Sequence, residues 1–238
     1  MNATASTSSP ARRVLLAVSA ALGPVLLAVG TALDPVGRGS GVADYLSRLS
    51  AAPVAYLVSG LTLWAGMALL PVTAAIVLHT ARSRPRSATL RVGAVSLSAW
   101  GVLGATGVAA GYTAGWVAAD IAAVAPQDVV DTVFLGITYG PWGTIGGAGG
   151  GVAWVLAMLL IGIGAIVARG VPAWAGVAVL VAFAVTIVGA SLDLTGVTAS
   201  GFLVLAAAAG GLVSAVRGVE TGGGVAVAPA PRAADLVE

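Results

Sequence analysis

Long apolar stretches alternate with short polar segments along most of the 238 residues. An α-helix needs ~20 consecutive apolar residues to cross the hydrocarbon core of a bilayer, and six stretches reach about that length. They are Val14–Leu33, Pro53–Leu78, Val92–Ala118, Thr144–Ala168, Pro172–Ser191 and Thr195–Val216. The pattern predicts an all-α fold, a polytopic membrane bundle of six transmembrane helices.

Two of the polar connections contain short amphipathic segments. In each segment four apolar residues recur at i, i+3, i+4 and i+7, which places them on one face of a helix. They are Val42, Tyr45, Leu46 and Leu49 in the first segment, and Val130, Val133, Phe134 and Ile137 in the second. We predict two short outer helices that lie on the membrane interface or fold over the mouth of the bundle.

The two ends of the chain differ in composition from the region between them. Residues 1–11 are small and polar, and residues 218–238 are rich in glycine, alanine and proline. Such segments bury too little apolar surface to offset the entropy of ordering. We therefore predict disordered tails at 1–11 and 218–238 and one transmembrane domain at 12–217. Arg12 and Arg13 also suit a secretory signal, but the apolar stretch that follows is longer than a signal requires.

The arginines are distributed unevenly among the polar segments. Cytoplasmic segments of membrane proteins carry an excess of positive residues, so we place the N-terminus in the cytoplasm. The outside segments then carry only two of the eleven basic residues, together with six aspartates, and the inside segments carry the other nine. The nine are Arg12, Arg13, Arg82, Arg84, Arg86, Arg91, Arg169, Arg217 and Arg232. Both termini are predicted to be cytoplasmic.

The same topology explains the net charge of +2 and the isoelectric point near 9.5 without a nucleic-acid partner. The cluster of Arg82, Arg84, Arg86 and Arg91 can also bind anionic lipid headgroups, which contribute ~1 kcal/mol per basic residue near a charged leaflet. Membrane lipid is therefore the predicted partner. Lysine is absent and alanine, valine and glycine are abundant, as is typical of a high-GC bacterium. We predict the cytoplasmic membrane of a bacterium as the location.

Glycines recur every four residues in the third and fourth stretches. Each set forms two overlapping GxxxG steps, which let a second helix backbone approach closely. The sets are Gly107, Gly111 and Gly115 in the third stretch, and Gly143, Gly147 and Gly151 in the fourth. Because both sets flank the same outer loop, we expect the two helices to pack against each other there. A GxxxG homodimer is the alternative.

Three of the six tryptophans lie deep within apolar stretches. Trp64, Trp100 and Trp154 are ~8–11 residues from a helix end, or about 12–17 Å along the axis. They are candidates for a pocket that binds an apolar or aromatic ligand. The alternative is ordinary packing, with each indole N–H bonded to a carbonyl or hydroxyl oxygen.

The sequence contains few groups that can do chemistry. Cysteine is absent and His79 is the one histidine, which excludes thiol nucleophiles and paired histidine ligands. No ionisable residue is predicted near the membrane midplane, where ion-coupled carriers hold theirs. The outer aspartates, including Asp128 and Asp131, lack the spacing of a known cation site. We expect neither an enzyme, nor a metal site, nor a cofactor.

In layout the chain resembles the small six-helix membrane proteins of actinobacteria that are related to the DUF4386-type proteins. The segments that carry this resemblance are Leu33-Asp34-Pro35, Ala51-Ala52-Pro53, Arg82-Ser83-Arg84-Pro85-Arg86 and Val171-Pro172-Ala173-Trp174. It covers roughly residues 12–217 and implies the same six-helix fold. The group has no established activity, so the resemblance implies no site residues.

Two functional hypotheses follow from the sequence. The first is a non-enzymatic membrane protein that acts as a structural, sensory or accessory component, alone, as a homo-oligomer or with a protein partner. The second is a small permease or a lipid-binding facilitator for a neutral or apolar molecule. A cavity that reaches the three tryptophans would favour the second hypothesis, and a dry bundle joined through its glycines would favour the first.

Overall fold

The computed structural model describes residues 10–36, 41–82, 84 and 86–221, and all of its regular structure is helical. The elements are α1 (Pro10–Leu33), α2 (Val42–Ala51), α3 (Pro53–Arg82), α4 (Ala88–Ala122), α5 (Gln127–Thr138), α6 (Pro141–Thr144), η1 (Ile145–Gly149), α7 (Gly150–Val167), α8 (Ala173–Ser191) and α9 (Thr195–Thr221). The segment η1 is a turn of π-helix inside the continuous run from α6 to α7.

Six helical spans are long and apolar enough to cross a membrane, which confirms the predicted class. They are Val14–Leu33, Pro53–His79, Ala88–Ala122, Pro141–Val167, Ala173–Ser191 and Thr195–Val213. Most of the predicted tails, 1–11 and 218–238, lies outside the described residues, although α1 begins at Pro10 and α9 ends at Thr221.

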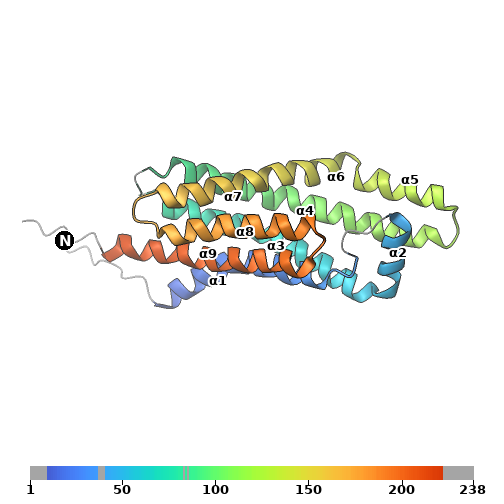
Figure 1. The fold of residues 1–238 in the computed structure, drawn as a ribbon, viewed down its shortest axis with the longest axis horizontal. Helices are drawn as coiled ribbons and strands as arrows, with labels where there is room; N and C mark the ends of the chain where they lie inside the picture. Colours follow the sequence, from blue (N-terminus) through green and yellow to red (C-terminus); the bar gives the residue numbers. More distant parts are fainter. Residues whose placement is uncertain (1–9, 37–40, 83, 85, 222–238) are drawn as a thin grey trace, which may run out of the picture.

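The six long helices form a closed ring in chain order. Each packs against the next, from α1 to α3, α4, α7, α8 and α9, and α9 packs against α1 to complete the ring. Short connections make successive helices antiparallel, as Figure 1 shows. Because every long helix has two ring neighbours, the side chains that point inward form one large core, beside two smaller clusters of buried residues.

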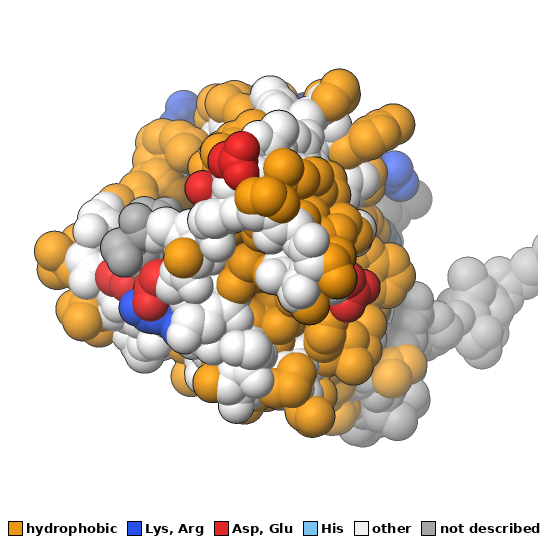
Figure 2. Space-filling view, turned by 90° about the vertical axis from the view of Figure 1, so that its right-hand side faces the viewer, with side chains coloured by type: hydrophobic (Ala, Val, Ile, Leu, Met, Phe, Trp, Pro, Cys, Tyr) orange, Lys and Arg blue, Asp and Glu red, His pale blue; other side chains and the backbone are white. Residues whose placement is uncertain are grey.

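The two ends of the ring are chemically different. One end, here called the arginine end, carries Arg82, Arg84, Arg86, Arg91 and Arg169 at the α3–α4 and α7–α8 connections. The described chain both begins and ends there (Figure 1). The other end carries α2 and α5. Figure 2 views this second end, where acidic side chains stand at several places on a largely uncharged surface.

The second end projects well beyond the shorter helices. At ~1.5 Å per residue, the 35 residues of α4 are ~52 Å long, against ~30 Å for a hydrocarbon core. The α8–α9 turn stops far short of α2 and α5 in Figure 1. Helix α5 runs back beside the end of α4, whereas α2 lies across the long axis. Both predicted amphipathic helices are therefore present at this end, in two different orientations.

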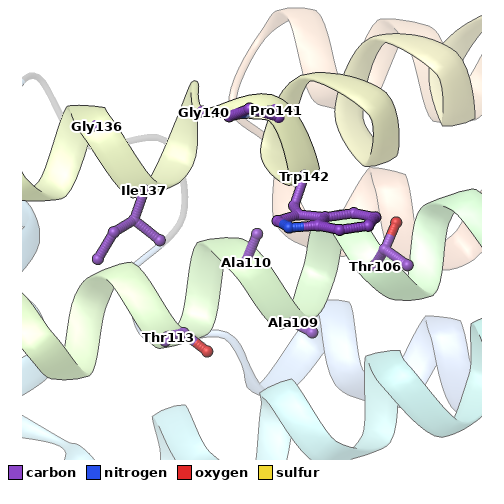
Figure 3. Close-up of a pocket in the computed structure, with 9 residues that line it drawn as sticks. All are labelled: Thr106, Ala109, Ala110, Thr113, Gly136, Ile137, Gly140, Pro141 and Trp142. Carbon is purple, nitrogen blue, oxygen red and sulfur yellow. The ribbon is translucent and has the colours of Figure 1, made fainter.

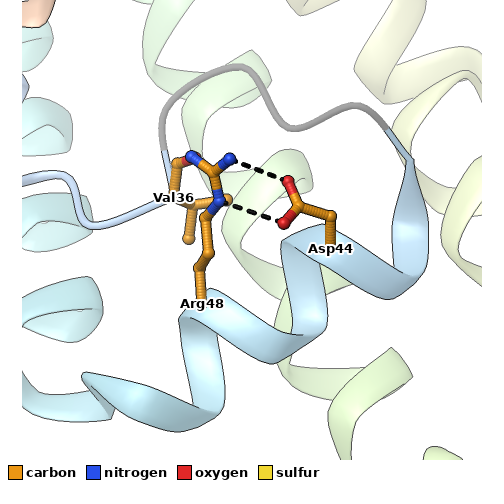
Figure 4. Close-up of polar contacts among 3 residues, drawn as sticks. All are labelled: Val36, Asp44 and Arg48. Atoms are coloured by element: carbon orange, nitrogen blue, oxygen red, sulfur yellow. Dashed lines mark hydrogen bonds and ion pairs between the residues drawn. The ribbon is translucent and has the colours of Figure 1, made fainter.

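Helix α2 is attached to the chain that precedes it by one arginine. Arg48 forms an ion pair with Asp44, at 2.9 Å, and its Nη1 donates to the Val36 carbonyl at 3.2 Å (Figure 4). The two charged side chains are about half and one third exposed. An ion pair this exposed contributes little free energy, so its role is to set the position of α2.

Two prolines inside helices create polar contacts between helices. Pro24 has no N–H and leaves the Ala20 carbonyl without its intrahelical donor. The buried hydroxyl of Thr73, on α3, donates to that carbonyl at 2.9 Å. Pro71 frees the Met67 carbonyl in the same way, and this oxygen lies against Gly101 of α4, where a Cβ would be only 2.7 Å away.

Single glycines, rather than stripes, bring neighbouring helices close together at the arginine end. A Cβ on Gly164 would lie 2.6 Å from the Leu90 nitrogen, and one on Gly93 would lie 2.7 Å from the Ile161 nitrogen. These two contacts join α4 to α7. The core beside them is filled, since side chains from all six long helices surround a void of only about 20 Å³.

Candidate functional site

Beyond this filled region five of the six ring helices border an open groove of about 420 Å³. We call it the tryptophan groove, because Trp100 of α4 and Trp154 of α7 both line it. Residues from α3, α4, η1, α7, α8 and α9 form its walls, so only α1 of the ring helices is absent. Along α4, Trp100 is ~18 Å and Gly107 ~28 Å from Ala88. The groove therefore occupies the half of the ring farther from the arginines.

One wall of the tryptophan groove has almost no side chains. Its six glycines are Gly104, Gly107, Gly146, Gly147, Gly150 and Gly151. Gly107 packs against the backbone of Gly146 and Gly147, and a Cβ on Gly150 would be 3.3 Å from the Gly104 nitrogen. The π-helix η1 lies in this wall. Single π-turns inside α-helices occur frequently at functional sites, and here one places consecutive glycines beside the groove.

The six predicted packing glycines do not form one interface. Gly107 does lie at the contact between α4 and η1, but Gly115 packs against Tyr45 and Tyr56, and Gly143 against the end of α5. Gly111, Gly147 and Gly151 would each accommodate a Cβ with no atom of a neighbouring element within 4 Å. The two helices do pack against each other as expected, and of the six glycines Gly107 lies at that contact, while a packing role for the whole set stays a prediction. Gly146, in the π-turn, and Gly150, which follows it, are the glycines of this stretch whose Cβ positions face α4.

Aromatic rings line the groove beside these glycines, on the same helices α4 and α7 and on α9. The Trp100 ring is nearly parallel to that of Phe202, with an interplanar angle of 20° and centroids 6.4 Å apart. The centroid of Trp154 lies 6.1 Å from that of Trp100 and 5.2 Å from that of Phe183. These contacts link α4, α7, α8 and α9 around the groove and hold the two indoles in fixed positions.

The polar groups of the groove are few and uncharged. Thr186 is buried, and its hydroxyl donates to the Ala182 carbonyl at 2.7 Å, which leaves its lone pairs free to accept. Trp100 is only 5% exposed and forms no hydrogen bond with another described residue. Its indole nitrogen is not one of the fully buried polar atoms that lack a partner, so it keeps some accessible surface. The groove is thus lined by two indole side chains and one hydroxyl acceptor in otherwise apolar surroundings.

The third tryptophan lies elsewhere. Trp64 is 48% exposed and lines a separate groove of about 380 Å³ between α3 and α4, together with Leu61, Tyr112 and Trp116. The expectation of one pocket lined by three tryptophans is thus met for Trp100 and Trp154 and not for Trp64. The distance from a helix end gives depth, but the direction of a side chain around the helix depends on how the helices pack.

A third groove, of about 500 Å³, separates α4 from α5 and α6. Figure 3 shows the Trp142 ring extending from α6 toward Thr106 of α4, with Ala110 nearby and Ile137 of α5 on the other side. This groove shares Ala109 and Thr113 with the Trp64 groove. The end of α4 is thus bordered by open apolar space on both sides.

A tyrosine cluster closes the α2–α5 end. The Tyr45 and Tyr56 hydroxyls are hydrogen-bonded to each other, and the Tyr56 and Tyr112 rings are 4.4 Å apart. The Tyr112 hydroxyl is 2.7 Å from the Ser59 hydroxyl, which donates to the Gly30 carbonyl at 2.8 Å. Burial raises the pKa of Tyr45, and the negative charge of Asp34 raises it further. The cluster ties α1, α2, α3 and α4 together.

Sequence reasoning missed several groups that line or border the tryptophan groove. Met67, Phe202 and the buried Thr186 belong to it, and the tyrosine cluster was not anticipated. Thr186 did carry a signal, because it is the only residue with a side-chain hydroxyl in the interior of an otherwise apolar α8. Among the described residues no group of three or more histidine, cysteine or acidic side chains is placed to hold a metal.

No known protein family, curated protein or solved structure matches this chain. The resemblance in layout to the DUF4386-type proteins stays a prediction.

Proposed function

We propose that this chain is a non-enzymatic, multi-pass membrane protein that binds a neutral, apolar molecule in the tryptophan groove. One observation supports the proposal above the others. The ring is filled by side chains toward the arginines, where only about 20 Å³ is empty, and it opens into about 420 Å³ beside Trp100 and Trp154. A bundle that served only as a structural component would have no need of the second feature.

The chemistry of the walls supports a neutral ligand. No described arginine, aspartate or glutamate lines the groove, and an unpaired charge buried in apolar surroundings is strongly unfavourable. Ligand sites usually combine apolar and aromatic walls with a few polar groups, and here Thr186 and the two indoles are those groups. The filled half lacks a continuous path, which supports binding rather than conduction through the described conformation.

The arginine end is proposed to face the cytoplasm of a bacterial cell. The groove would then open in the outer half of the membrane, near the α8–α9 turn. Because the natural sequence has no cysteine, one introduced cysteine reports sidedness directly. In intact cells a membrane-impermeant maleimide should label Val124→Cys, at a residue that is 87% exposed, and should spare Arg86→Cys. The reverse result would invert the proposed orientation.

The binding proposal can be tested by native mass spectrometry of the protein extracted gently from its own membrane. We expect a copurifying apolar molecule on the natural protein that is lost in Gly151→Leu. That substitution fills the groove, and its Cβ meets no atom of a neighbouring element. The matched control is Gly111→Leu, at an equally open glycine of α4 that lines none of the three grooves described above.

The controls separate a binding defect from misfolding. Both variants replace glycine by leucine inside a helix, so both gain similar helix propensity. Loss of the molecule from Gly151→Leu alone supports the proposal. A natural protein that carries no bound molecule, or equal retention by both variants, would contradict it and favour an accessory component instead.

A further inference from the structure

We infer that the ligand of the tryptophan groove is a hydrocarbon chain of a bilayer lipid, which passes into the ring between α3 and α4. The inference rests on the binding function proposed above and goes further by naming the class of ligand and its route. In this arrangement the head group of the lipid stays outside the ring, beside Trp64 and Trp116, while one chain extends inward to Trp100.

The tryptophan groove and the Trp64 groove meet at one side chain. Val108 of α4 lines both of them. One turn before it, Gly104 lines only the tryptophan groove, and one turn after it, Tyr112 lines only the Trp64 groove. Because residues four apart follow one another along a helix face with a small rotation, these three positions lead from the inside of the ring to its outer surface.

The partition between the two grooves consists of side chains. On α3, Trp64 lines the outer groove and Met67, one turn further on, lines the inner one. The Met67 sulfur packs against Gly104, where a Cβ would be only 2.8 Å away. A methionine side chain is unbranched and adapts its shape readily. A rotation of Met67 beside the half-buried Val108 therefore widens the passage without separating the helix backbones.

The passage lies at the depth where a lipid chain leaves its head group. Along α4, Val108 is ~30 Å and Trp116 ~42 Å from Ala88. A hydrocarbon core of ~30 Å that begins beside the arginines therefore ends near Val108. Trp64 is 48% exposed and lines the outer groove with Val108, as suits the aromatic belt at a membrane surface. A head group beside Trp116 directs its chains toward the level of Trp100.

The walls of both grooves suit a hydrocarbon chain better than water. Neither groove is lined by a described charged residue, and their volumes of about 420 and 380 Å³ are those of ordinary ligand sites. Ordered water needs several polar partners, and apolar hollows without them stay dry. The molecules beside the ring at this depth are lipids. A flexible chain can follow the bend at Val108 and gain dispersion contacts with both grooves.

The test uses tryptophan fluorescence in vesicles of a phosphatidylcholine that carries two bromine atoms near the middle of one acyl chain. Bromine quenches an indole only at close range, so quenching shows which tryptophans a chain reaches. The reporter is the full-length protein with Trp100 as its one tryptophan and phenylalanine at the other five positions. Trp100 is only 5% exposed, yet we expect brominated vesicles to quench it strongly relative to unbrominated ones. A second reporter that keeps only Trp64 shows that brominated chains reach the outer surface.

Two substitutions in the Trp100 reporter assign the quenching to this route. Gly151→Leu fills the tryptophan groove and should remove most of the quenching. Val108→Phe narrows the passage and should also remove most of it, because the chain must lie across this position. The matched controls are Gly111→Leu and Val102→Phe, at α4 residues that line none of the three grooves, and both should be quenched as the reporter is. Each protein is accepted only if it elutes as one folded species.

The possible outcomes separate the inference from the proposed function. The inference is overturned if Trp64 is quenched and Trp100 is not, or if Gly151→Leu or Val108→Phe leaves the quenching of Trp100 unchanged. If a molecule still copurifies with the natural protein in that case and is lost in Gly151→Leu, the binding function stands with a different ligand or route. If Trp100 is not quenched and nothing copurifies, both the inference and the proposed function are overturned.

Discussion

The two halves of the helix ring use similar residues to opposite effect. In the half next to the arginines, Leu70, Met158, Val179 and their neighbours meet at the centre and leave about 20 Å³ empty. In the other half the ring helices other than α1 border an open groove of about 420 Å³ lined by glycines and aromatic rings. Both halves contain many glycines, so glycine content does not distinguish a tightly packed region from an open one.

What differs is the atom that faces each glycine. Gly93 and Gly164 lie against the backbone of the neighbouring helix, so the missing side chain shortens the distance between helices. Gly147 and Gly151 face open space, so the missing side chain leaves a hollow. Helices in lipid associate largely through van der Waals packing. A glycine therefore stabilises the bundle only where a second backbone approaches closely.

Filling a glycine should have its largest effect in the packed half. Gly164→Leu places a side chain where a Cβ alone would be 2.6 Å from the Leu90 nitrogen, so α4 and α7 must separate. We expect a loss of about 3 kcal/mol or more in the free energy of unfolding, measured by thermal unfolding in detergent. Gly151→Leu is the matched substitution in the open half and should stay within about 1 kcal/mol of the natural protein. Equal losses would remove the distinction between the halves.

Two methionines test the same comparison of the halves by removing a side chain instead of adding one. Met158 is 1% exposed and borders the small void, whereas Met67 is half-buried and lines the groove. Met158→Ala should cost about 2 kcal/mol, because it leaves a cavity that the ring cannot collapse around. Met67→Ala should cost less than about 1 kcal/mol, since it only enlarges an existing opening. SDS-induced unfolding of both variants measures the difference, and a larger cost for Met67→Ala would contradict it.

Removing the hydrogen bond between α1 and α3 should lower the free energy of unfolding moderately. A second substitution should cancel much of that loss. Thr73→Val keeps the shape of the side chain but removes the donor to the Ala20 carbonyl, at a cost of about 1 kcal/mol. Replacing Pro24 by alanine restores an intrahelical N–H donor to that carbonyl. In the Pro24→Ala background, Thr73→Val should therefore cost about half as much or less. Additive costs in unfolding experiments would show that the two side chains do not share this carbonyl.

The smallest expected effect lies at the α2–α5 end and depends on pH. Burial raises the pKa of Tyr45 above its ordinary value of 10.0, so the neutral hydroxyl is favoured in the folded protein. The resulting stabilisation is complete below about pH 10 and is lost as pH rises through the folded-state pKa. Tyr45→Phe should cost about 0.5–1 kcal/mol at neutral pH and should reduce the loss of stability at alkaline pH. Melting temperatures recorded for both proteins across that range would test this, and parallel alkaline losses would argue against it.

The sequence by itself determined the class of fold and the course of the chain. A run of ~20 apolar residues has the length and polarity of a helix that crosses a membrane, where the backbone polar groups must be paired within the helix. The predicted stretches agree with the six observed spans within a few residues at most ends. The amphipathic helices at Val42–Ala51 and Gln127–Thr138 were also foreseeable, because a helical face repeats with a fixed period.

Only the tertiary structure decided which face of each helix points into the ring. Hydrophobic periodicity marks the buried face of a helix in water, but in lipid both faces are apolar and the period is lost. For that reason the sequence could give the depth of Trp64, Trp100 and Trp154 along their helices but not the direction of their side chains. The packing of the helices leaves Trp64 exposed and buries Trp100. Likewise, spacing in the sequence could not show that Gly146 and Gly150, rather than Gly147 and Gly151, face α4 beside the π-turn at Ile145–Gly149.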